Sequence, residues 1–191
     1  MNKTAITAAP ILPIIAERWS PRSFDHDYKL SQHELLSVLE AARWAPSANN
    51  LQPWRYSVLV KGTPEHEKFS ETLSGWNRAW APHASAIILV SIVHTTPDGK
   101  ENTIAWYDAG LSVANLTLQA QELGLHTHQM AGFDHAAAHA ALGLAPELQA
   151  IVAVVIGKAA PADQLEGPLH EREIQPRVRH ELDDIVLHGK P

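Results

Sequence analysis

Cysteine is absent from the 191 residues, and the chain also lacks a surplus of basic residues and any long hydrophobic run. Without cysteine the protein has no disulfide, no thiolate metal site and no cysteine nucleophile. The 15 Lys and Arg residues face 21 Asp and Glu, and the net charge of -6 argues against a nucleic-acid-binding face or a polybasic membrane anchor. The apolar stretch from Ile87 to Val93 is far shorter than the roughly 20 residues that span a bilayer.

The familiar motifs for phosphate binding and hydrolysis are also missing. The sequence has no Walker A motif, no G-x-G-x-x-G loop, no G-x-S-x-G nucleophile elbow and no HExxH pair. An anionic ligand must therefore be held by side chains. Pro10, Pro13 and Glu17 interrupt the N-terminal apolar patch, so we expect no secretory signal. With 45% hydrophobic and 19% charged residues, we expect one globular domain over 1–191 and a cytoplasmic protein.

Hydrophobic periodicity and capping residues divide the chain into helices and strands. Ser31 followed by Glu34 is a capping box at the start of the best-defined helix, and Pro46 ends that helix. The patterns predict helices at 11–18, 31–45, 65–73, 103–123 and between Asp134 and Gly143, and strands at 56–60, 85–93 and 151–156. Their alternation predicts a mixed sheet with helices on both faces. From Ala159 onward the chain is too polar to form a core of its own.

Two pairs of arginines are candidates for binding an anion. Arg18 and Arg22 are four residues apart around a helix end, and Arg177 and Arg179 alternate in the C-terminal tail. Four guanidiniums directed at one point suit a phosphomonoester, which accepts forked hydrogen bonds. Surface ion pairs are the alternative for either pair taken alone.

The segment 45–54, APSANNLQPW, is a candidate for recognising a heterocycle. Two prolines fix its backbone, and its amides and hydroxyl supply hydrogen-bond donors and acceptors. Histidine is also abundant: His126 and His128 are two residues apart, and His135 and His139 share a helix face. Because no acidic ligand lies beside either pair, we expect ordinary hydrogen-bonded histidines and no metal site.

Several blocks, in order, resemble the nitroreductase family of flavin enzymes from Ile14 to His188. They are ERWSPRSFD, LLSVLEAARWAPSANNLQPWRYSVLV, YDAGLSVANLTLQAQELGL, QMAGFD and IVAVVIGK. The resemblance implies an α+β fold with a central mixed or antiparallel β-sheet flanked by helices. It also implies a homodimer in which the C-terminal segment, about 160–191, reaches onto the partner subunit.

The same resemblance implies an FMN-dependent oxidoreductase. FMN is expected to bind non-covalently at the subunit interface, and NADH or NADPH is expected to reduce it. By a ping-pong mechanism the electrons then pass to a nitroaromatic, a quinone or a related electrophile. Small molecules are the expected partners, with no nucleic acid and no membrane.

The residues of the cofactor site are likewise implied by matching family positions. The first flavin-binding block and the phosphate-binding tail correspond to Arg18, Trp19, Ser20, Arg22, Arg177 and Arg179. Arg22 is expected near flavin N1 and the C2 carbonyl, where a cation stabilises the charge that develops on reduction. The block contributed by the partner subunit corresponds to Pro46, Ser47, Ala48, Asn50 and Gln52.

Two further family positions complete this expected site. Asn77 matches an asparagine at the pyrimidine edge of the flavin. The turn whose backbone N–H points at flavin N5 corresponds to Met130, Ala131 and Gly132. No general acid is assigned, and water is expected to deliver protons.

The chain departs from the family pattern at two positions and in one loop. Larger members carry a glutamate where Ala131 stands and a lysine where Trp80 stands. The connection from Val93 to Thr103 has no large insertion, so the pocket is expected to be more open than in those members. Trp76, Trp80 and Trp106 either line that pocket or belong to the core.

Three alternatives remain beside this activity. One is specialised flavin chemistry on the same fold, such as flavin destruction or reductive dehalogenation. Another is a flavin-binding protein with little turnover, and the last is a metal protein built on the histidines. The sequence does not name the acceptor or choose between NADH and NADPH.

Overall fold

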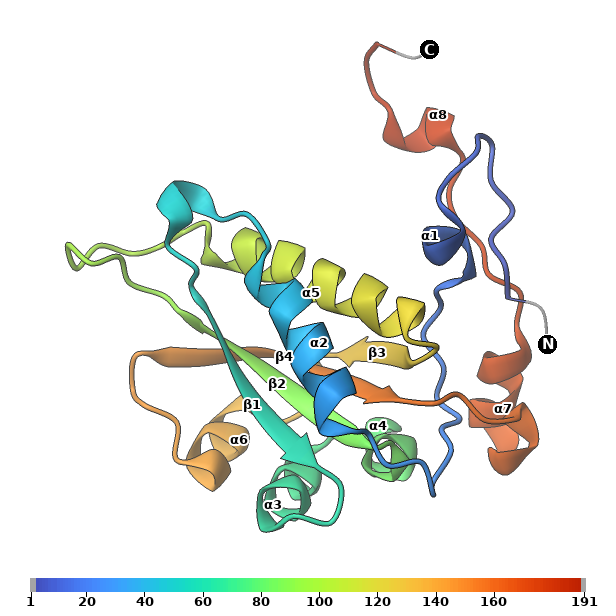
Figure 1. Ribbon diagram of the computed structural model, residues 1–191, viewed down its shortest axis with the longest axis horizontal. Coiled ribbons are helices and arrows are strands. Elements are labelled where there is room, and N and C mark those ends of the chain that lie inside the picture. Colours follow the sequence, from blue (N-terminus) through green and yellow to red (C-terminus); the bar gives the residue numbers. More distant parts are fainter. Residues whose placement is uncertain (1–2, 190–191) are drawn as a thin grey trace.

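The computed structural model describes residues 3–189, which form a sheet between two helical layers and two projecting terminal segments (Figure 1). The helices, with short 3-10 turns marked η, are α1 (Pro13–Glu17), α2 (Gln32–Arg43), η1 (Ala48–Asn50), α3 (Pro64–Thr72), α4 (Asn77–Trp80), η2 (Ala81–His83), α5 (Ala105–Glu122), α6 (His135–Leu142), η3 (Ala162–Gln164), α7 (Gly167–Ile174) and α8 (Leu182–Ile185). The strands are β1 (Trp54–Val60), β2 (Ala86–Val93), β3 (His126–Met130) and β4 (Leu148–Gly157).

The sheet has the order β1-β2-β4-β3, and each neighbouring pair is antiparallel. The predicted α+β class is therefore confirmed, and of the mixed and antiparallel alternatives the structure has the antiparallel one. The apolar run in β2 is buried on both faces, as predicted, because consecutive side chains of a strand point to opposite layers. Ile88 packs in the layer of α2 and α5, and Leu89 packs in the layer of α3 and α6.

Local signals located most of the predicted elements. Ser31 and Glu34 form the predicted capping box, with the Glu34 N–H donating to Ser31 Oγ at 3.2 Å. Asp134 caps α6 by accepting from the Ala137 N–H at 2.9 Å. The first helix, predicted at 11–18, is shorter: α1 begins at Pro13 and ends at Glu17. Proline is favoured in the first turn of a helix, which explains the start at Pro13.

Other boundaries and elements were not predicted. The strands β1 and β4 begin two and three residues before the expected Tyr56 and Ile151. The elements β3, α4, α7 and α8 have no counterpart among the predicted helices and strands. The strand β3, with the sequence HTHQM, is too polar for a hydrophobic strand signal, and it forms because it pairs with the apolar β4.

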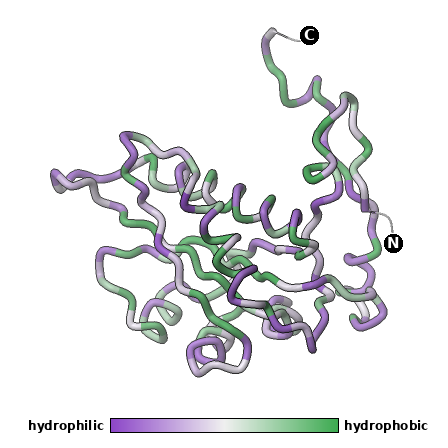
Figure 2. The backbone as a smooth tube through the Cα atoms, in the orientation of Figure 1, coloured by the Kyte–Doolittle hydropathy of each residue, from purple (hydrophilic) through white to green (hydrophobic). Residues whose placement is uncertain are grey.

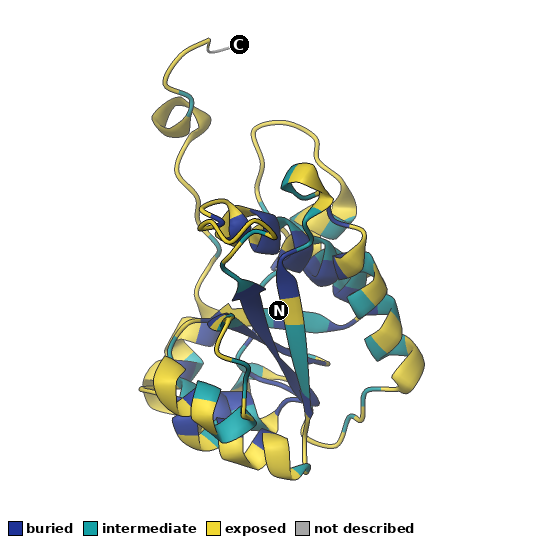
Figure 3. Ribbon diagram, turned by 90° about the vertical axis from the view of Figure 1, so that its left-hand side faces the viewer, coloured by how far each residue is buried: buried dark blue, intermediate teal, exposed yellow. Residues whose placement is uncertain are grey.

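The C-terminal tail divides into a packed part and an exposed part. Leu169 and Glu173 of α7 are buried against the body of the same chain, so this part of the tail packs on the core formed by earlier residues. The tail beyond them leaves the body: Val178 is 76% and Leu187 is 78% exposed (Figure 3). Parts of the projecting N- and C-terminal segments are hydrophobic, as the green stretches of Figure 2 show. Between residues 3 and 189, no helix is both long and apolar enough to cross a membrane.

Candidate functional site

Three of the four predicted arginines gather where the N-terminal segment meets the C-terminal tail. Burial and the neighbouring cations Arg177 and Arg179 lower the pKa of Arg18, and burial and Arg179 lower the pKa of Arg177. The groups that accept their hydrogen bonds are neutral. Arg18 donates to Ser20 Oγ at 3.3 Å, Arg177 to the carbonyls of Lys3 and Ala16 at 2.6 Å, and Arg179 to the carbonyl of Val178 at 2.7 Å. Like charges held together in this way favour a bound anion.

The fourth arginine, Arg22, faces a different set of groups. Its guanidinium lies 3.9 Å from the carboxylate of the buried Glu173, and its other charged neighbour is Arg172. Arg22 thus differs from the other three arginines in having a carboxylate beside it. The loop that carries it is fixed by His128, whose Nδ1 lies 2.8 Å from the Pro21 carbonyl. Burial lowers the pKa of His128 to about 4, against a smaller opposite effect of that carbonyl.

Trp19 and His126 complete this side of the molecule. Their rings meet edge to face at 6.1 Å, and the ammonium of Lys3 lies 5.1 Å from the centre of the Trp19 ring. Trp19 is thus half-buried by its own chain next to the arginines.

The turn after β3 is closely packed against the segment before α4. The carbonyl of Gly132 accepts hydrogen bonds from the Ser74 N–H at 2.9 Å and from Asn77 Nδ2 at 3.2 Å. A Cβ atom at position 132 would lie 2.5 Å from Asn77 Nδ2, so only glycine fits without displacing that amide. Met130 is buried and Ala131 is exposed. The structure therefore brings Asn77 and the 130–132 turn together, as the predicted site requires.

The loop predicted to read a heterocycle has a strained backbone. Asn49, Asn50 and Gln52 have φ values of 50°, 55° and 47°, which side-chain-bearing residues seldom adopt. Ser47 Oγ accepts from the Gln52 N–H at 3.0 Å. The carboxylate of the buried Asp108 on α5 accepts from the Ala48 N–H at 3.2 Å. These bonds hold the loop in place, and Pro46 and Asn50 remain exposed.

Within one chain, this loop is distant from the arginines. Figure 1 shows η1 beyond the C-terminal end of α2, whereas α1 and the C-terminal tail lie on the opposite side of the molecule. Residues 46–52 therefore lie apart from the cluster of Arg18, Arg177 and Arg179 within the same chain.

The tryptophans have different environments. Trp80 is 1% exposed and lies parallel to Phe24 with ring centres 6.2 Å apart, and its ring centre is 4.5 Å from that of His128. Of the two predicted alternatives, Trp80 therefore belongs to the core and does not line an open pocket. Trp76 and Trp106 are 50% and 52% exposed and are available to a ligand.

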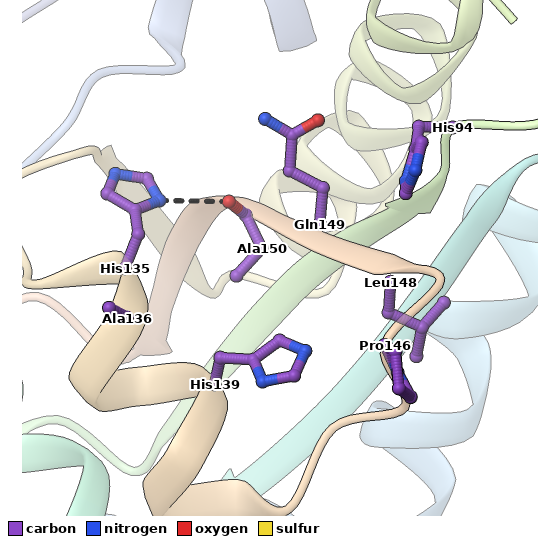
Figure 4. A pocket seen from close by; sticks show the side chains of 8 residues that line it. All are labelled: His94, His135, Ala136, His139, Pro146, Leu148, Gln149 and Ala150. Atoms are coloured by element: carbon purple, nitrogen blue, oxygen red, sulfur yellow. Dashed lines mark hydrogen bonds between the residues drawn. The ribbon is translucent and has the colours of Figure 1, made fainter. Parts of the chain in front are cut away.

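The histidine pair on α6 lines a separate hollow of about 490 Å³, together with His94 and Gln149 (Figure 4). His135 Nδ1 lies 2.9 Å from the Ala150 carbonyl and His139 Nε2 lies 3.1 Å from the Ala145 carbonyl. Over residues 3–189, no three His, Asp or Glu side chains are close enough together to hold a metal ion. Each of the two α6 histidines instead has a backbone carbonyl within hydrogen-bond distance.

Three polar residues near the predicted site were not identified from the sequence: the buried Asp108 and Glu173, and the partly buried His128. Asp108 interrupts the apolar face of a helix, which is a signal that sequence analysis can detect. His128 was considered only as a metal ligand. Glu173 lies in a charged tail that resembles a solvated surface, so nothing in the sequence distinguished it.

The structure is thus an α+β protein with an antiparallel sheet, a cluster of three arginines and a tightly packed glycine turn. A sequence profile described as Nitroreductase family matches residues 15–78 and 60–158. The chain belongs to the nitroreductase family, as its sequence blocks predicted.

Solved and curated relatives agree with this membership. A crystal structure described as an oxidoreductase containing FMN superposes with a TM-score of 0.91 and 32% identity, covering 100% of this chain and 96% of that one. A CLA biosynthesis enone reductase from Lactiplantibacillus plantarum is 35% identical over 79 residues, which are 41% of this chain and 36% of that protein. An oxygen-insensitive NADPH nitroreductase from Helicobacter acinonychis is 31% identical over 77 residues, 40% of this chain and 36% of that protein. The chain thus aligns with about a third of the length of these two enzymes.

Proposed function

We propose that the protein is an FMN-dependent oxidoreductase that takes electrons from NADH or NADPH and passes them to a small electrophile. The observation that carries this proposal is the cluster of Arg18, Arg177 and Arg179, whose acceptors are neutral. FMN held by these residues would supply the redox chemistry, which is hydride uptake from the nicotinamide and electron transfer to an acceptor. The protein contributes binding, orientation and electrostatics.

The residues present fit this cofactor. A flavin phosphate is nearly dianionic, and three guanidiniums that repel one another are stabilised by such a group. The carbonyl of Gly132 accepts hydrogen bonds from Ser74 and Asn77, and the missing side chain leaves room for the Asn77 amide, which is the group proposed to meet the pyrimidine edge of the flavin. Arg22 supplies the cation beside the ring, where it favours the reduced state. Water delivers protons, since no side chain is assigned as a general acid.

We also infer that the site is completed by a second copy of the chain. The 46–52 loop has a strained, donor-rich backbone fixed by Asp108, yet it is distant from the arginines of its own chain (Figure 1). Exposed apolar side chains on the terminal segments support the same conclusion: Ile6, Leu12, Val178, Leu182, Ile185 and Leu187. A homodimer that exchanges its C-terminal segments would bury them and bring Pro46, Ser47, Ala48, Asn50 and Gln52 to the partner's cofactor.

For the electron acceptor, we propose a chemical class: an electron-poor π system. The relatives described above are named for a nitro group and for an enone, both of which are electron-poor π systems. The exposed rings of Trp76 and Trp106 suit stacking on a flat molecule of this kind. A nitroaromatic, a quinone or an enone therefore fits better than a saturated substrate.

The test is an absorbance spectrum of the purified protein before and after anaerobic addition of NADH or NADPH. Oxidised flavin bands that disappear with either nucleotide, and return on adding a nitroaromatic or quinone, are the expected result. A colourless protein that also fails to bind added FMN would overturn the proposal. Consumption of FMN or release of halide would identify specialised flavin chemistry, and tight binding with negligible reduction would identify a flavin-binding protein.

A further inference from the structure

Glu173 is a buried acid whose carboxylate contacts the loop carrying Arg22. Glu173 is 2% exposed, and with Leu169 it is one of two buried residues on the largely charged helix α7. The carboxylate accepts from the Arg22 N–H at 2.9 Å and from the Ser23 N–H at 3.1 Å. Burying a carboxylate is costly unless it is hydrogen-bonded and paired. The two N–H groups of the loop meet this need, and in return the carboxylate fixes the position of the loop.

The same carboxylate is the anionic neighbour of the Arg22 side chain. Glu173 Oε2 lies 3.9 Å from Arg22 Nη1, and the guanidinium is partly buried. Around this pair, the charged groups are Lys3, which donates to the Glu173 backbone carbonyl at 2.6 Å, and Arg172 on the exposed face of α7. Within a partly buried site, a charge at this distance from Arg22 is only weakly screened by water.

We propose that Glu173 is a positioning residue that fixes the Arg22 loop and, by offsetting the charge of Arg22, keeps the reduction potential of the bound flavin low. The inference depends on the proposed FMN function. Reduction adds two electrons and one proton to the flavin, which leaves negative charge on its pyrimidine side. A cation there favours the reduced state, and an anion paired with that cation opposes it. Position 80 of this chain is Trp and not Lys, so Arg22 and Glu173 are the main charges that act on the pyrimidine side of the flavin.

The experiment compares the midpoint potential of FMN bound to the wild type, Glu173→Gln and the control Glu171→Gln. Glutamine keeps the size of the side chain and one acceptor oxygen for the loop N–H groups while removing the charge. Glu171, on the same helix but exposed, loses the same charge away from the loop. Potentials are measured by equilibration with a reference dye during anaerobic reduction by dithionite, so neither NAD(P)H nor turnover is needed.

We expect Glu173→Gln to shift the equilibrium toward reduced flavin by about tenfold, which for a two-electron couple is about 30 mV. Glu171→Gln should leave the potential unchanged. A purely structural role would weaken binding of oxidised and reduced FMN equally and would not move the potential. An unchanged or lowered potential in a Glu173→Gln protein that still binds FMN therefore overturns the inference.

Two safeguards separate the possible failures. If Glu173→Gln does not fold, Glu173→Asp keeps the buried charge but withdraws it from Arg22 by one methylene, and a smaller rise in potential is expected. No rise in that variant also counts against the inference. A wild-type protein that binds no FMN contradicts the proposed function itself, whereas a wild type that binds FMN with no change in the Glu173 variants contradicts only this role.

Discussion

The side-chain amide of Asn77 occupies the space into which a side chain at position 132 would extend. A Cβ on Gly132 would lie 2.5 Å from Asn77 Nδ2, the same atom that donates to the Gly132 carbonyl at 3.2 Å. We expect Gly132→Ala to displace this amide and cost about 1 kcal/mol of the free energy of unfolding, the net value of a typical hydrogen bond. Urea denaturation measures this loss, and FMN titration should show weaker binding.

The matching control is a double-mutant cycle with Asn77→Ala. If the clash is the cause, the stability cost of Gly132→Ala should largely disappear once the Asn77 amide is removed. Equal costs in both backgrounds would show that the close contact is not responsible.

The role of Arg179 can be tested by comparing FMN with riboflavin, which lacks the phosphate. The guanidinium is exposed and its acceptor is the carbonyl of its neighbour, so Arg179→Ala should leave folding intact. Losing one charge-assisted hydrogen bond should weaken FMN binding about tenfold or more and leave riboflavin binding unchanged. Fluorescence titration measures both affinities. Arg43→Ala, an exposed arginine paired with Glu40 on α2, is the control and should affect neither ligand.

Stability should fall in mild acid because of His128. Burial lowers its pKa to about 4, so the unfolded chain, with a pKa near 6.5, binds the proton first as pH falls. The stability that depends on a neutral His128 is therefore complete above pH 6.5. Protonation removes it between pH 6.5 and pH 4, which lowers the free energy of unfolding by about 3 kcal/mol in all. His128→Asn retains a donor for the Pro21 carbonyl but does not titrate. Its unfolding free energy, measured by urea titration across this range, should be flatter with pH than that of the wild type; parallel curves would contradict the assignment.

Dimer formation through the C-terminal segment predicts a specific effect at Ile185. This residue is 62% exposed in the single chain, and the proposed exchange would bury it against the partner. Ile185→Glu should weaken association at least tenfold, because an unpaired charge is costly in an apolar interface. Sedimentation equilibrium measures the change. Val60→Glu, at an exposed position at the end of β1, should leave the dimer intact, and a dimer unaffected by both substitutions would argue against the exchange.

The parts of the fold that the sequence predicted are those determined by neighbouring residues. The capping box at Ser31 and Glu34, the cap at Asp134 and the buried run of β2 are local patterns, and each lies where it was predicted. The polar strand β3 and the helix α7 were missed because their conformations depend on distant partners. β3 pairs with β4, and α7 is held through Glu173 by the loop at Arg22.

The candidate site follows the same division. The sequence by itself determined the family, through blocks such as APSANNLQPW, and it determined which arginines could meet an anion. Tertiary structure alone decided that Arg18, Arg177 and Arg179 are neighbours while Arg22 faces Glu173, and that Trp80 is buried beside Phe24. The physical reason is that caps and periodicity act over a few residues, whereas the pairing of charges depends on contacts between segments about 150 residues apart.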